Sequence, residues 1–139
     1  MNAPSNLFME SATQLAIFLG NKPGALAEVC QELAKAEINI HALTISDTVD
    51  HSIVRMVVSN PTKALMILGE RGVLALETDV LMIRTDNKPG MLARIAERLS
   101  KEKVNIEYAY MAATINSEDG LMILRPSDFD KALIVLRDL

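Results

Sequence analysis

The feature that most constrains this chain of 139 residues is an internal repeat. The segment Asn21-Lys22-Pro23-Gly24 returns unchanged as Asn87-Lys88-Pro89-Gly90, an offset of 66 residues. Residues 21–40 and 87–106 are identical at ten of twenty aligned positions, and residues 63–68 match residues 131–136 at an offset of 68. Two copies of a period of this length predict paired domains rather than a solenoid, with a small insertion in the second copy.

Both copies carry the hydrophobic pattern of the same secondary-structure elements. Apolar residues at spacings i, i+3, i+4 and i+7 after the repeated turn predict a helix, and alternating apolar residues predict strands. In the first copy the expected strands are 14–19, 38–46, 51–58 and 73–77, with a second helix at 63–70. In the second copy they are 80–85, 104–114 and 120–125, with a second helix at 129–138.

This order, β-α-β-β-α-β, predicts an α+β fold of two ferredoxin-like units, each an antiparallel sheet with both helices on one face. We expect an N-terminal arm at residues 1–12 and domains at 13–78 and 79–139. The second unit lacks an evident fourth strand. Because exposed sheet edges are usually protected, we expect the arm (Leu7, Phe8, Met9) or a partner chain to cover that edge.

Composition excludes several function classes. A net charge of −4 and an aromatic content of 4% argue against a nucleic-acid binder, which needs cations and stacking side chains. The single cysteine excludes an intramolecular disulfide and any CxxC motif. No apolar stretch approaches the roughly 18 residues of a membrane helix, and the N-terminus has no signal-peptide pattern. We therefore expect a cytoplasmic protein that needs no metal or cofactor and does not bind membranes.

The repeated turn has the clearest ligand chemistry. It precedes an expected helix, whose first N–H groups attract anions, and its glycine lets a ligand approach the backbone. Its asparagine offers both a donor and an acceptor, which suits a free α-amino acid. The alternative is structural: Asn caps the helix, Pro begins it and Gly allows a tight turn. Four identical residues in both copies favour ligand binding, because turns are built in several ways.

The element order, the turn N-x-P-G-x-L and the Asn-Ile pair after the first helix resemble the ACT domain family, over residues 13–77 and 79–139. The chain resembles a tandem ACT-domain protein without an attached catalytic domain. ACT domains are regulatory modules that bind small molecules, most often amino acids, at interfaces between paired domains. The resemblance implies two ligand loops, Asn21, Lys22, Pro23, Gly24, Ala25 and Leu26, and Asn87, Lys88, Pro89, Gly90, Met91 and Leu92.

Further ligand contacts follow from the same resemblance. In the family, the residue that starts the second strand can reach a ligand in a neighbouring domain. The matching positions are Asn39-Ile40 and Asn105-Ile106. Members that bind serine carry a histidine two residues before the turn Asn, where this chain has Leu19 and Thr85. Leu19 suits an apolar ligand side chain and Thr85 a more polar one, so the two sites differ or one is degenerate.

These observations predict a non-catalytic, allosteric regulator or sensor that binds an amino acid and forms a homodimer. The alternative is a detached regulatory subunit that acts through a partner enzyme of amino-acid biosynthesis. An acylphosphatase-like enzyme would need an arginine where the turns have Lys22 and Lys88, and no nucleophile–base pair is evident. An RNA-binding domain of this fold would need more aromatic and basic residues on its strands.

Overall fold

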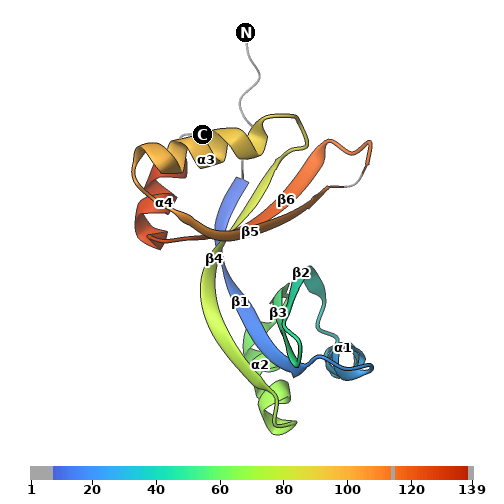
Figure 1. Cartoon of the computed structure of the whole chain (residues 1–139). Helices are drawn as coiled ribbons and strands as arrows, with labels where there is room; N and C mark the ends of the chain where they lie inside the picture. The colour runs from blue at the N-terminus through green and yellow to red at the C-terminus, as the bar shows by residue number, and fades with distance from the viewer. Residues whose placement is uncertain (1–7, 114, 138–139) are drawn as a thin grey trace. The chain divides into compact units, whose positions relative to one another are not determined.

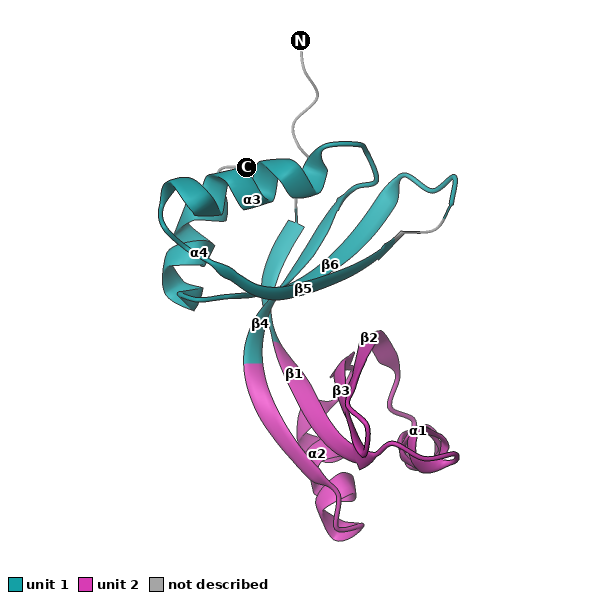
Figure 2. Ribbon diagram, in the orientation of Figure 1, with its two compact units in different colours: residues 1–12, 79–139 teal, residues 13–78 magenta. Residues whose placement is uncertain are grey.

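The computed structural model describes residues 8–113 and 115–137 of the chain (Figure 1). They fall into two compact units (Figure 2). Unit 2 comprises residues 13–78, and unit 1 combines residues up to Ala12 with those from Asp79 onward. The strands form a six-stranded sheet in the order β2-β3-β1-β4-β6-β5.

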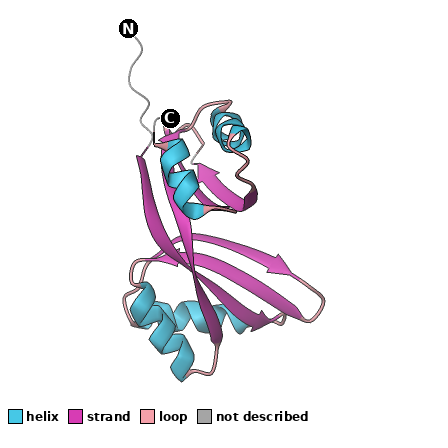
Figure 3. Cartoon of the chain, turned by 90° about the vertical axis from the view of Figure 1, so that its left-hand side faces the viewer, coloured by secondary structure: helices cyan, strands magenta, loops and turns pink. Residues whose placement is uncertain are grey.

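Unit 2 contains the first copy of the repeat. Its elements are the end of β1 (Phe8–Gly20), α1 (Ala25–Lys35), β2 (Ile40–Asp47), β3 (His51–Val58), α2 (Pro61–Glu70) and the start of β4 (Leu74–Asp86). Antiparallel ladders join β3 to both β1 and β2. Leu33 of α1 and Leu68 of α2 pack into one core with Leu15 and Ile17 of β1, so both helices cover the same face of the strands (Figure 3).

Unit 1 repeats this arrangement with the second copy. Its elements are the rest of β4, α3 (Met91–Lys101), β5 (Ile106–Ala113), β6 (Asp119–Pro126) and α4 (Phe129–Leu136). Antiparallel ladders join β6 to β4 and β5. Leu99 of α3 and Leu136 of α4 share a core with Leu81 and Ile83 of β4. The two units therefore confirm the predicted tandem ferredoxin-like fold. The predicted ends Thr114 and Asp138 lie outside the described residues.

Two strands are longer than the sequence pattern predicts. β1 and β4 each span 13 residues, and the strands expected at 73–77 and 80–85 are one continuous strand. The first part of β1, Phe8–Ala12, belongs to unit 1, where Met9 packs against the core. The order within unit 1 is thus β5-β6-β4-β1, so the N-terminal segment supplies the fourth strand of that unit. Leu7, which the same expectation named, is outside the described part of the chain.

Candidate functional site

In the repeated turn of unit 2, the asparagine does not cap the helix and the proline does not begin it. The helix begins at Ala25, and its N-cap is Gly24, which has a φ of +89°. Pro23 therefore lies before the N-cap, and the expectation that it begins the helix is wrong. Asn21 does not cap the helix either, because its Nδ2 donates to the carbonyl of Thr48 at 3.0 Å. The asparagine instead ties the turn to the β2–β3 connection.

The turn of unit 1 has the same construction. Gly90 is the N-cap of α3 with a φ of +90°, and Asn87 Nδ2 donates to the carbonyl of Ser117 at 2.9 Å. No side chain in the described ranges caps either α1 or α3. The N–H of Ala25 donates to the carbonyl of Lys22, and that of Met91 to the carbonyl of Lys88, both at 3.4 Å. The next two N–H groups of each helix, which have no partner inside the helix, are left to a ligand or to water.

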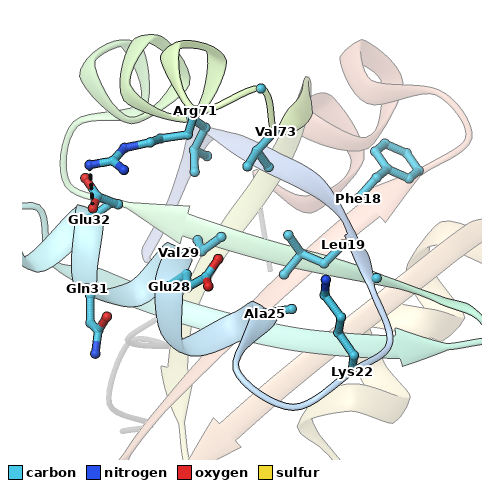
Figure 4. A pocket seen from close by; sticks show the side chains of 13 residues that line it. Phe18, Leu19, Lys22, Ala25, Glu28, Val29, Gln31, Glu32, Arg71 and Val73 are labelled. Atoms are coloured by element: carbon cyan, nitrogen blue, oxygen red, sulfur yellow. Dashed lines mark ion pairs between the residues drawn. The ribbon is translucent and has the colours of Figure 1, made fainter.

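A pocket of about 560 Å³ opens beside the turn in unit 2 (Figure 4). The end of β1, the first turns of α1, the end of α2 and the residue before β4 form its walls. Buried apolar side chains contribute Leu19, Val29 and Leu68 to its lining. The other lining residues are Phe18, Gly20, Lys22, Ala25, Glu28, Gln31, Glu32, Arg71, Gly72 and Val73.

The charged groups of this pocket are spread along its length. Figure 4 shows Lys22 along one side, Glu28 in the middle, and the ion pair of Glu32 with Arg71 on the far side. The Arg71 Nη2 atom lies 2.9 Å from Glu32 Oε1, which also lies 3.4 Å from the Nζ of Lys35. Lys22 makes no salt bridge with any residue that the structure describes. The pocket thus combines an apolar lining with one cation and one carboxylate outside the Glu32–Arg71 pair.

The structure brings together some of the predicted site residues of unit 2. Leu19, Lys22 and Ala25 line the pocket, while the rest of the loop, Asn21, Pro23, Gly24 and Leu26, flanks them. Asn39 and Ile40 lie at the opposite end of the sheet, where Asn39 N donates to Ser59 Oγ at 2.9 Å. A ligand at the turn therefore has no contact with Asn39 of the same unit.

In unit 1 the corresponding residues are arranged differently. Thr85 is 5% exposed and donates from Oγ1 to the carbonyl of Asp86 at 3.1 Å, and Met91 is 9% exposed and belongs to the core. Lys88, Pro89 and Leu92 are exposed. Asn105, followed by Ile106 at the start of β5, donates its backbone N–H to Ser127 Oγ at 2.9 Å. The arrangement at Asn105 repeats that at Asn39.

Sequence reasoning missed the contribution of α2 to the pocket. Leu68, Arg71, Gly72 and Val73 are about 50 residues from the turn in the chain, and no spacing pattern relates them to it. The one local signal is the glycine at position 72, shortly after the expected helix 63–70, which has a φ of +73°. The ion pair between Glu32 and Arg71 could not be predicted either, because no repeat or helical spacing relates these two positions.

The described residues offer little for other chemistries. None of their His, Cys, Asp and Glu side chains form a group of three or more that is placed to hold a metal ion. Across residues 8–113 and 115–137, no helix is long and apolar enough to span a membrane.

Comparisons with known proteins agree with this architecture. A family model described as an ACT domain pair matches residues 10–139. Protein BT0572 from Bacteroides thetaiotaomicron is 42% identical with a TM-score of 0.87, over 93% of this chain and 88% of that one. No curated protein matches the chain.

Two more distant structures share the fold. The ligand-free regulatory subunit of aspartate kinase from Thermus thermophilus has a TM-score of 0.69 at 20% identity, over 98% of this chain and 97% of that one. Aspartate kinase from Synechocystis has a TM-score of 0.67 at 19% identity, over 99% of this chain and 26% of that one. The match of the family model to nearly the whole chain confirms the resemblance found in the sequence, and the chain belongs to the ACT domain-pair family.

Proposed function

We propose that the protein is a non-catalytic regulator that binds a free amino acid in the pocket of unit 2. The observation that carries the proposal is the meeting of an uncapped helix N-terminus, an unpaired lysine and an apolar lining in one cavity. A ligand carboxylate would bind the N–H groups of Leu26 and Ala27 in the first turn of α1 and the ammonium of Lys22. These groups are provided by the turn that the sequence repeats.

The remaining groups of the pocket favour an aliphatic amino acid. The ammonium group of the ligand would face the carboxylate of Glu28, and its side chain would contact Leu19, Val29 and Leu68. Burying an aliphatic side chain is favourable by about 1.5–3 kcal/mol, which such a lining can supply. A cytoplasmic homodimer in which Asn39 and Asn105 reach ligands of neighbouring domains remains part of this proposal. Regulation would then follow from different ligand affinities of two arrangements.

A second candidate is a regulatory subunit that acts on a separate enzyme of amino-acid biosynthesis. The observation that favours it is the fold shared with a regulatory subunit of aspartate kinase over nearly the full length of both chains. This candidate uses the same pocket and differs only in its output. Purification with and without the bound amino acid, followed by an aspartate kinase assay of the co-purified protein, separates the two candidates.

Thermal unfolding in the presence of each of the twenty amino acids tests the proposal. We expect valine, leucine or isoleucine at millimolar concentration to raise the melting temperature, because a ligand that binds only the folded state stabilises it. Lys22→Gln removes the cation at the pocket and should abolish most of the shift. Lys88→Gln changes the equivalent residue of unit 1 and serves as the matched control. If no amino acid shifts the melting temperature of the wild-type protein, the proposal is wrong.

A further inference from the structure

We infer that each chain binds one amino acid, in unit 2, and that the equivalent turn of unit 1 has lost its site. The inference rests on the proposed function and concerns the occupancy of its two repeated turns. The turns have the same backbone, with N-cap φ angles of +89° and +90°. The residues beside the repeated motif determine whether each turn has space for a ligand and charged groups to bind it.

The first difference is the residue that begins the helix. Ala25 begins α1 and lines the pocket, where its short side chain leaves space. Met91 begins α3, is 9% exposed and packs into the core of unit 1. Ile95 also replaces the smaller Val29 one helical turn later, and it is fully buried. Protein interiors are close-packed, so the larger side chains occupy the volume that the first copy keeps for a ligand.

The second difference is the partner of the turn lysine. Residue 20 is a glycine, and Lys22 makes no salt bridge with the described part of the chain. At the matching position of unit 1 stands Asp86, whose Oδ2 atom lies 3.8 Å from the Nζ of Lys88. This carboxylate competes with a ligand carboxylate for the lysine and repels it. The cation of the second turn is therefore partly neutralised, whereas Lys22 of the first turn has no such neighbour among the described residues.

The third difference is the charge of the helix face beside the turn. Glu28 of α1, which would face the ligand ammonium, is replaced by Arg94 in α3. An arginine would repel that ammonium group. One change acts in the opposite direction: Thr85 is smaller than Leu19, but it is buried and its hydroxyl already donates to a backbone carbonyl. The space for a ligand, the cation for its carboxylate and the carboxylate for its ammonium group thus all favour binding at the first turn.

Isothermal titration of the full chain with L-valine, L-leucine and L-isoleucine tests this inference, together with hydrogen exchange measured by mass spectrometry. We expect one molecule bound per chain, with protection from exchange in residues 18–33 and none in residues 84–99. Ala25→Met, which copies unit 1, should abolish binding. Gly20→Asp should weaken it about fivefold, as expected for one competing surface ion pair. An added Cβ at Gly20 meets only Lys22 carbons at 3.8–3.9 Å, so this variant is expected to fold.

Met91→Ala and Asp86→Gly are the matched controls, and both should leave the affinity unchanged. Two molecules bound per chain, protection in residues 84–99, or unchanged binding by Ala25→Met would overturn the inference while leaving the proposed function standing. Tighter binding by Asp86→Gly together with an unchanged affinity of Gly20→Asp would place the site in unit 1 and also overturn it. Failure of the wild-type chain to bind any amino acid would instead refute the proposed function, and the inference with it.

Discussion

The left-handed N-cap glycine is the most exacting local requirement of the repeated turn, and Gly24→Ala tests it. Gly24 has a φ of +89°, and a Cβ added there would meet no atom within 4 Å. The substitution therefore causes no clash, and its cost comes only from the backbone conformation. An L-residue in the left-handed region costs about 1–2 kcal/mol. Alanine also restricts the unfolded chain, which offsets about 0.4–1 kcal/mol of that cost.

The expected net effect of Gly24→Ala is a decrease of about 0.8 kcal/mol in the free energy of unfolding, within a range of about 0–1.6 kcal/mol. Gly69→Ala is the matched control, because Gly69 lies in α2 without a left-handed φ and a Cβ there also meets nothing within 4 Å. It should increase the free energy of unfolding by about 0.5–1 kcal/mol. Gly24→Asn should cost less than Gly24→Ala, because asparagine populates the left-handed region more readily.

Urea unfolding followed by circular dichroism at 222 nm measures these effects through the midpoint at a constant slope. The reasoning predicts opposite signs for one chemical change at two open positions. It would be refuted if Gly24→Ala were more stable than the wild type. A cost for Gly69→Ala equal to that for Gly24→Ala would also refute it, because a cost shared by both positions cannot come from the left-handed backbone of Gly24.

The remaining predictions concern stability and use the same measurement. Asn21→Ala should lower the free energy of unfolding by about 0.5–1.5 kcal/mol, because it loses the 3.0 Å hydrogen bond that ties down the turn. Asn39→Ala should change it by less than about 0.5 kcal/mol, and an equal cost for both would contradict the assigned tether. Leu33→Ala, at a residue that is 1% exposed, should cost about 2–5 kcal/mol, whereas Met66→Ala, at 63% exposure, should be nearly neutral. Asn60→Ala removes the N-cap bond of α2 at 3.1 Å and should cost about 0.5–2 kcal/mol; no loss would mean that water replaces the cap.

Most of the fold was predictable because local patterns repeat it twice. The helical spacing after each turn and the alternation in the strands identified the elements and their order. The prediction of two separate strands was wrong because β4 continues past the point where the alternating apolar pattern ends. Thr78 and Asp79 fall between the expected strands 73–77 and 80–85, yet β4 runs through them from Leu74 to Asp86. Hydrogen bonds to neighbouring strands keep the backbone extended there. The hydrophobic pattern of the segment itself does not indicate such pairing.

The same limit applies to the candidate site. The turn was found from its sequence, but the two functions expected of its asparagine, ligand binding and helix capping, were both inferred from the turn alone. Asn21 instead bonds to Thr48, 27 residues away, and the far side of the pocket comes from Arg71. These are contacts between segments that only the folded chain brings together. The turn could be located in the sequence because consecutive residues form it. The pocket was missed because residues far apart in the chain line it.

The repeat also separates what a motif determines from what it leaves open. Four identical residues produce the same turn in both units, with asparagine tethers of 3.0 and 2.9 Å and the same left-handed N-cap. The residues on either side differ: Gly20 and Ala25 flank one motif, whereas Asp86 and Met91 flank the other. The motif therefore specifies the backbone that can receive a carboxylate, and its neighbours specify whether space and charge permit it. A match to the motif alone identifies the loop, and the ligand has to be argued from the flanking residues.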